Sequence, residues 1–188
     1  MYQICVSGAA KGVSVEEGKE LARKAGAAIA EAGHALMTGA TVGLPNYAAE
    51  GYKAAGGKMS FGISPAGSKV EHVRKYRLPT EAYDVILYSG LHYVGRDSLL
   101  ITSSDAVVSI GGRLGTLHEF TIAMESDTPI GFLQGAGGVS THIAQLMELA
   151  QPLKPGATVL FDNDPFELVK NLTAALDREN SKYLDIYA

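Results

Sequence analysis

The sequence has little cysteine and no tryptophan, since Cys5 is the single cysteine among its 188 residues. One cysteine cannot form the internal disulfides that hold small secreted domains together, so the composition favours a cytoplasmic protein. No apolar run approaches the roughly 20 residues that a membrane-spanning helix needs. The first residues also lack the charged segment that precedes the apolar core of a secretory signal. We therefore expect a cytoplasmic location and no membrane partner.

An excess of charge of one sign is also missing. Charged residues make up 19% of the chain, and 16 basic against 20 acidic residues leave a formal net charge of −4. A nucleic-acid groove needs clustered Lys and Arg, which this mixed pattern does not supply, so we expect no nucleic-acid partner. The length and the 46% hydrophobic content suit one domain with a sizeable core. We expect residues 1–188 to form it, with the last dozen as a tail.

Several familiar motifs are missing as well. The chain has neither the phosphate loop G-x-x-x-x-G-K-S/T nor the G-x-S-x-G elbow, which disfavours a P-loop ATPase and a serine hydrolase. The loop Gly8–Gly12 lacks the middle glycine of the dinucleotide fingerprint, and no acidic residue ends the second strand, which disfavours a standard NAD site. The histidines show no metal-ligand spacing. We expect no metal site and no cofactor.

What is present is a regular alternation of strand and helix patterns. Apolar strand patterns occur at residues 2–6, 35–37, 59–64, 85–88, 106–110, 129–133 and 158–161. Helical patterns occur at about residues 15–32, 45–55, 96–103, 116–126, 141–150 and 165–176. Residues 65–83 show no clean period. Strands that alternate with helices are parallel and joined by crossovers, so we expect an α/β fold: a Rossmann-like open parallel sheet with helices on both faces.

The most informative stretch is residues 104–119, which reads Ser-Asp-Ala-Val-Val-Ser-Ile-Gly-Gly-Arg-Leu-Gly-Thr-Leu-His-Glu. It predicts a buried strand, a glycine turn, and a helix that opens with Thr116. The unpaired N–H groups and partial positive charge of a helix N-terminus suit a phosphate, and glycines allow its close approach. The phosphate contacts predicted from this turn are Gly111, Gly112, Arg113, Gly115 and Thr116. The side chain of Arg113 either clamps the phosphate or points into solvent.

Other glycine loops should reach the same edge of the sheet, where ligands bind in such folds. The loop Gly8–Gly12 predicts a nucleotide contact at Gly8, or only a tight turn between strand and helix. The loop Gly39–Gly43 predicts contacts at Gly39 and Gly43, or only a helix entry. The loop Gly135–Gly138 is a weaker candidate, and we expect it to be a flexible rim.

Two charged side chains are candidates for chemistry. Glu119 lies three positions after Thr116, so it either closes a capping box or faces the phosphate turn as an acid, a base or a cation stabiliser. Arg96, at the start of a predicted helix, is either a surface arginine or a ligand contact. His118 should lie on another helix face than Glu119, in packing or at the rim. Cys5 should be a buried, small apolar side chain.

These residues resemble a known family. The segment Gly111–Glu119 resembles the P-G-G-x-G-T-x-x-E signature of the LOG (Lonely Guy) family, whose members were formerly labelled lysine decarboxylases. Arg96 and the segment Ser104–Ala106 are similar to the family's R-K and S-D-A elements, with the same spacing from arginine to glutamate. The segment Gly39–Leu44 is similar to its G-G-G-x-x-G-L loop.

The resemblance implies a homodimer or larger homo-oligomer that hydrolyses nucleoside 5′-monophosphates to free base and ribose 5-phosphate. It assigns the catalytic roles to Arg96 and Glu119, and phosphate binding to Gly112, Gly115 and Thr116. The sequence departs from the family pattern by having Gly111 for a proline, Arg113 for a glycine and Asp97 for a lysine.

A related branch carries the molybdenum cofactor. The alternative function is therefore a carrier of a nucleotide or another phosphate-bearing cofactor, which Arg113 favours because it adds anion affinity without adding chemistry.

Overall fold

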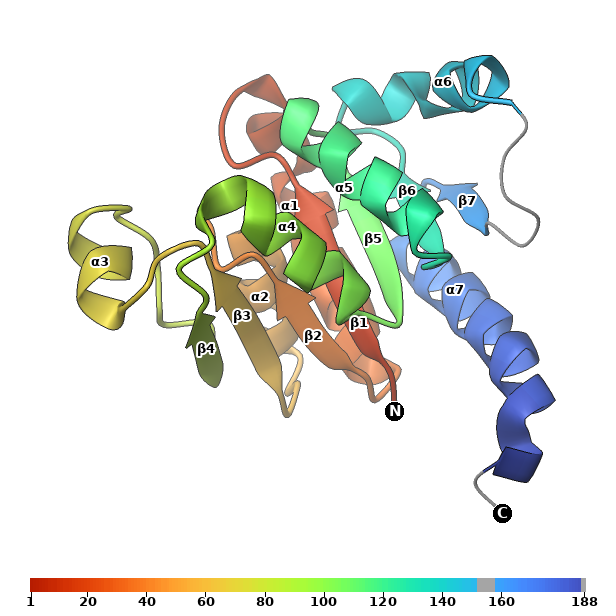
Figure 1. The fold of residues 1–188 in the computed structure, drawn as a ribbon, viewed down its shortest axis with the longest axis horizontal. Helices are drawn as coiled ribbons and strands as arrows, with labels where there is room; N and C mark the ends of the chain where they lie inside the picture. The colour runs from red at the N-terminus through yellow and green to blue at the C-terminus, as the bar shows by residue number, and fades with distance from the viewer. Residues whose placement is uncertain (152–157, 187–188) are drawn as a thin grey trace.

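The computed structural model describes residues 1–151 and 158–186, and it contains one seven-stranded parallel sheet (Figure 1). The strands are β1 Gln3–Gly8, β2 Ala35–Thr38, β3 Ser60–Ser64, β4 Val85–Tyr88, β5 Ala106–Ile110, β6 Ile130–Leu133 and β7 Val159–Asp162. The α-helices are α1 Val13–Glu31, α2 Leu44–Ala54, α3 Lys69–Arg74, α4 His92–Thr102, α5 Leu114–Glu125, α6 Ile143–Leu149 and α7 Pro165–Asn180. Two short 3₁₀-helices are η1 Val139–His142 and η2 Ser181–Ile186. The predicted α/β fold with an open parallel sheet is confirmed.

The order of the strands in the sheet is β4-β3-β2-β1-β5-β6-β7. The chain therefore builds the sheet outward from β1 to β4, returns to place β5 beside β1, and continues to β7. Val6 pairs with Val108 and Gly8 with Ile110, so β1 and β5 end at the same level. The reversal of strand order between them is the topological switch point, beyond which open α/β sheets bind their ligands.

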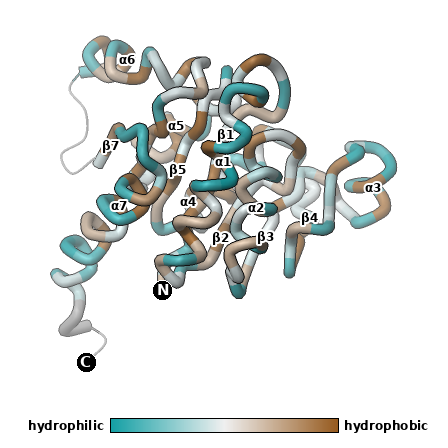
Figure 2. The backbone as a smooth tube through the Cα atoms, turned by 180° about the vertical axis from the view of Figure 1, so that it is seen from behind, coloured by the Kyte–Doolittle hydropathy of each residue, from teal (hydrophilic) through white to brown (hydrophobic). Residues whose placement is uncertain are grey.

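Helices cover both faces of the sheet because its central strands are apolar on both sides. Helices α1, α2 and α7 pack on one face, over Ile4 and Val6 of β1. Helices α4 and α5 pack on the other face, over Cys5, which is fully buried as predicted. In Figure 2, which shows the hydropathy of the chain from behind, α7 alternates hydrophilic and hydrophobic residues, as expected of a helix with one covered side.

Helices α1 and α2 touch at the level of their backbones. A Cβ atom on Gly26 of α1 would lie 1.9 Å from the carbonyl oxygen of Ala48, and one on Gly51 of α2 would lie 2.1 Å from that of Arg23. Two glycines, one on each helix, therefore permit this crossing. The close approach fixes α2 against α1, and with it the loop that leads from β2 toward the switch point.

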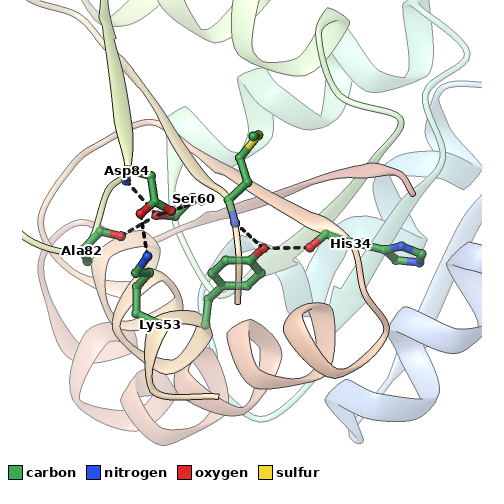
Figure 3. Close-up of polar contacts among 7 residues, drawn as sticks. His34, Lys53, Ser60, Ala82 and Asp84 are labelled. Carbon is green, nitrogen blue, oxygen red and sulfur yellow. Dashed lines mark hydrogen bonds and ion pairs between the residues drawn. The ribbon is translucent and has the colours of Figure 1, made fainter. Parts of the chain in front are cut away.

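The amino ends of β2, β3 and β4 are joined by polar contacts (Figure 3). The carboxylate of Asp84 accepts hydrogen bonds from Nζ of Lys53 at 2.6 Å and from the backbone N–H of Ser60 at 2.8 Å. These two contacts lower the pKa of Asp84. The hydroxyl of Tyr52 donates to the carbonyl of His34 at 2.9 Å and accepts from the N–H of Met59. This edge of the sheet is thereby tied to α2, and the loops with predicted functions lie at the opposite edge.

Several predicted boundaries need correction. Helix α4 begins at His92 rather than Arg96, because Val94 and Gly95 are weak helix formers that hid its first turn. Helix α7 continues to Asn180, so the predicted tail begins with its last turn; the final two residues of that tail lie outside the described residues.

The region 65–83 contains an unpredicted helix, α3. Its N-cap Ser68 accepts from the N–H of Glu71, and Glu71 accepts from the N–H of Gly67 in return.

Among the described residues, no helix combines the length and apolar character that crossing a membrane requires.

Candidate functional site

A cavity of about 240 Å³ opens at the carboxyl ends of β1 and β5. Its walls come from the loops after β1, β2 and β5 and from helices α2, α4 and α5. The predicted site residues that line it are Gly8, Gly39, Arg96, Arg113, Gly115, Thr116 and Glu119. Unpredicted lining residues include Ser7, Thr41, Tyr93 and Asp97. The structure therefore brings the two predicted catalytic residues and much of the predicted phosphate turn into one cavity.

The N-terminus of α5 forms one wall. The helix begins at Leu114 rather than Thr116, and Arg113 is its N-cap. The first N–H with an intrahelical partner is that of Leu117, which donates to the carbonyl of Arg113 at 3.0 Å. The N–H groups of the three preceding residues have no acceptor inside the helix. A Cβ atom on Gly115 would meet nothing within 4 Å, so the backbone is open to an anion there.

Gly111 and Gly112 shape this turn from behind the cavity wall. Both have positive φ angles, +59° and +94°, and a Cβ atom on Gly112 would lie 1.9 Å from the hydroxyl oxygen of Thr116. The carbonyl of Gly112 accepts from the N–H of Val139 at 2.9 Å. The loop Gly135–Gly138 therefore packs against the phosphate turn, with Ala136 fully buried, whereas its predicted flexibility stays a prediction.

The loop after β2 has a different role from the one predicted. Gly43 does not line the cavity: a Cβ atom there would lie 2.4 Å from the carbonyl oxygen of Ala9, in the loop after β1. The first N–H of α2, that of Leu44, already donates to Ala9, and the next residue, Pro45, has no N–H. The N-terminus of α2 is therefore a poorer anion site than that of α5, and Gly43 joins two loops.

Arg96 is buried in the middle of α4, with 5% of its surface exposed, so it is not a surface arginine. A Cβ atom on Gly39 would lie 1.8 Å from Nη1 of Arg96, which shows that the guanidinium occupies the space of a missing side chain. Nη2 lies 3.4 Å from Oδ1 of Asp97. Nε is buried and has no hydrogen-bond partner among the described residues. The guanidinium therefore keeps donors free for a ligand.

Glu119 lies in the second turn of α5, 8% exposed, and its Oε2 accepts a short hydrogen bond from Oγ of Ser7. The helix starts too early for Glu119 to close a capping box, and no side chain caps its N-terminus, so the capping alternative is wrong. Burial, followed by the negative charge of Asp97, raises the pKa of Glu119 to about 7. This carboxyl therefore exchanges a proton near neutral pH, as groups in catalytic sites often do.

Ser7, Asp97 and Tyr93 were not predicted. Asp97 is buried between Arg96 and His118, whose Nδ1 lies 3.1 Å from its Oδ2. His118 lies on another helix face than Glu119, as predicted, and lines a shallow groove between α4 and α5. Tyr93 stands half-exposed at the cavity. For Ser7, the one available signal in the sequence was its position as a polar residue beside Gly8, at the end of an apolar strand.

Comparison with known proteins agrees with this architecture. The family model described as the SLOG cluster4 family matches residues 1–169. An uncharacterised protein of Archaeoglobus fulgidus is 32% identical over 134 residues, which cover 71% of this chain and 81% of that protein.

Solved structures with a similar fold cover nearly the whole chain. TM1055 superposes with a TM-score of 0.79 and 25% identity, covering 93% of this chain and 99% of that one. The molybdenum cofactor carrier protein of Chlamydomonas reinhardtii superposes with a TM-score of 0.72 and 27% sequence identity, covering 92% of this chain and 98% of that one. The molybdenum cofactor binding protein of Rippkaea orientalis superposes with a TM-score of 0.71 and 24% sequence identity, covering 92% of this chain and 96% of that one. At this identity the likeness shows only that the two chains share a fold. The resemblance noted for Gly111–Glu119 is thus confirmed at the level of the family: the chain belongs to the SLOG cluster4 family and has its LOG-type, Rossmann-like fold.

Proposed function

We propose that the protein hydrolyses the N-glycosidic bond of nucleoside 5′-monophosphates and releases the free base and ribose 5-phosphate. The observation that carries this proposal is the meeting of Glu119, Arg96 and the N-terminus of α5 in one cavity. Cleavage at C1′ requires a carboxyl that can reach the sugar of a nucleotide whose phosphate is held in the same cavity.

The phosphate would bind at the N-terminus of α5. The free N–H groups near Gly115 and Thr116, with the partial positive charge of the helix end, favour an anion there. Arg113 is exposed, lines the cavity and adds a positive charge there. With the phosphate in that place, the guanidinium of Arg96, which lines the same cavity, would contact other oxygens of the ligand.

In the reaction, water attacks C1′ as the bond to the base nitrogen breaks. The ionised carboxylate of Glu119 takes a proton from the water and stabilises the positive charge that develops on the ribose ring. The electron pair of the broken bond leaves with the base, which takes up a proton. A carboxyl with a pKa near 7 is a stronger base than an ordinary glutamate and is still ionised to a useful extent at neutral pH.

The test is incubation of the purified protein with AMP, GMP, CMP and cytokinin monophosphates, with release of base measured by chromatography. The change Glu119→Gln should lower kcat by about a thousandfold or more while nucleotide binding persists, because it removes the base but keeps the shape. Glu31→Gln, at the exposed end of α1, is the matched control and should keep full activity. Absence of release from every nucleotide of the panel would refute the proposal.

A carrier of a phosphate-bearing cofactor is the second candidate. It is favoured by the likeness to the Chlamydomonas reinhardtii carrier, which is 27% identical and extends over nearly the whole of both chains. A carrier would keep its ligand through purification, and Glu119→Gln would leave that retention unchanged. Mass spectrometry of the small molecules released from denatured protein separates the two functions, since an enzyme releases its products.

A further inference from the structure

We propose that Ser7 and Asp97 are positioning residues for the two proposed catalytic groups, Ser7 for the Glu119 carboxyl and Asp97 for the Arg96 guanidinium. This inference rests on the proposed function. Its test includes a measurement on the ligand-free protein, so that its outcome can be read whether or not the protein is an enzyme.

Ser7 fixes one oxygen of the Glu119 carboxyl. It is the penultimate residue of β1, 2% exposed, and strand alternation turns it toward α4 and α5 on the same side as Cys5. Its hydroxyl donates to Oε2 of Glu119. Its neighbour in register on β5, Ser109, has a buried hydroxyl with no partner among the described residues, so the Ser7 proton is not shared with it. The rigid central strand therefore aims Oε2, and Oε1 is left for water.

Asp97 fixes the guanidinium from the other side. Its Oδ2 is held by Nδ1 of His118 at 3.1 Å, across the contact between α4 and α5. Its Oδ1 lies 3.4 Å from Nη2 of Arg96. Gly39 closes the remaining side, since the guanidinium fills the place of its missing Cβ. These neighbours bound the group on two sides, and its Nε has no hydrogen-bond partner within residues 1–151 and 158–186.

The same two residues act on the charge of Glu119 in opposite directions. The ionisable groups that face it are Cys5 from β1, Arg96 and Asp97 from α4, and His118 beside it on α5, with Arg113 at the mouth of the cavity. Burial, and after it the negative charge of Asp97, raises the pKa of Glu119, whereas the hydrogen bond from Ser7, and then the charges of Arg96 and His118, lower it. A donor to a carboxylate stabilises its ionised form, and a neighbouring carboxylate destabilises it.

The first experiment is a carbon-13 NMR titration of the glutamate side chains in the ligand-free protein, with the Glu119 signal identified by its loss in Glu119→Gln. Ser7→Ala should move the midpoint of Glu119 upward and Asp97→Asn should move it downward, each by about half a unit or more. Ser104→Ala, a buried serine bonded to a backbone carbonyl, and Asp127→Asn, in an exposed turn, should leave it unchanged. Shifts in the same direction, or none, would overturn the proposal.

The second experiment measures the pH dependence of kcat with the same variants. The midpoint of the pH profile of kcat should move in the same direction as the NMR midpoint of Glu119. Ser7→Thr, which keeps a hydroxyl, should show the wild-type profile. Asp97→Asn should lower kcat more than it raises KM, because it loosens a group without removing it. Should the NMR shifts occur with no turnover by the wild type, the positioning stands and the proposed reaction fails. Normal turnover with unmoved profiles would refute the positioning roles alone.

Discussion

At the scale of single residues, the site is defined by polar groups that are buried yet incompletely satisfied. Nε of Arg96 has no protein partner among the described residues, and Glu119 is bonded through one oxygen to Ser7. Leaving buried polar groups without partners costs stability, so the two groups are candidates for contact with a ligand or an ordered water. The contact between Ser7 and Glu119 joins residues 112 positions apart. Local spacing carries no information on such a pair, which explains why Glu119 was predicted and its partner was not.

The raised pKa of Glu119 has a consequence for stability that needs no substrate. Its ordinary value of 4.5, which applies to the unfolded chain, rises to about 7 in the folded protein. Between these values the folded state holds a proton that the unfolded state has lost, so stability falls as pH rises through this window. Glu119→Gln removes the effect and should stabilise the protein above pH 7 by up to about 3 kcal/mol.

Urea unfolding at several pH values measures this difference. The free energies of unfolding of the variant and the wild type should converge below pH 4.5, where Glu119 is protonated in both the folded and the unfolded wild-type protein. A gap that stayed constant with pH would mean that the pKa of Glu119 is the same in the folded and the unfolded protein, and that the substitution acts through packing alone.

At the scale of elements, the alternation of strand and helix patterns was enough to predict the sheet, because burial on both faces imposes continuous apolar runs. Helix starts were less predictable. Neither α4 nor α5 has a side chain that caps its N-terminus, so the usual signal is missing at both helices of the site. Glycines were ambiguous for another reason: Gly43 serves a contact between loops and Gly115 an opening to the cavity, yet both look alike in sequence.

The crossing of α1 and α2 gives a prediction at this scale. Gly26→Ala places a methyl group 1.9 Å from a backbone carbonyl of α2, so the helices must separate. We expect a loss of roughly 2 kcal/mol or more in the free energy of unfolding, as for other overpacked positions. Gly33→Ala is not a fair control because its φ is positive, whereas Ala27→Gly, on the same helix, measures the propensity difference in the opposite direction. A gain in stability for Gly26→Ala, similar in size to the loss for Ala27→Gly, would show that the contact is not essential.

At the scale of the whole molecule, homo-oligomerisation stays a prediction from the family resemblance. Apolar side chains lie exposed at the starts of α4 and α5, among them Val94 and Leu114, the latter 82% exposed. Exposed apolar groups that gather near a site mark candidate interfaces. We expect a dimer in sedimentation experiments and a monomer after the paired changes Val94→Asp and Leu114→Asp. Leu149→Asp, on the exposed face of α6, should leave the dimer intact. A monomeric wild type would contradict the prediction.

The packing of Arg96 against Gly39 also bears on how this family can diverge. The guanidinium fills the volume that a side chain at position 39 would need, since a Cβ atom there would lie 1.8 Å from Nη1 of Arg96. A side chain at position 39 would therefore displace the end of the Arg96 side chain from the place that it holds here. We expect related chains to show these positions changing together, and a chain with a side chain at the position of Gly39 to place its arginine differently or to lack it.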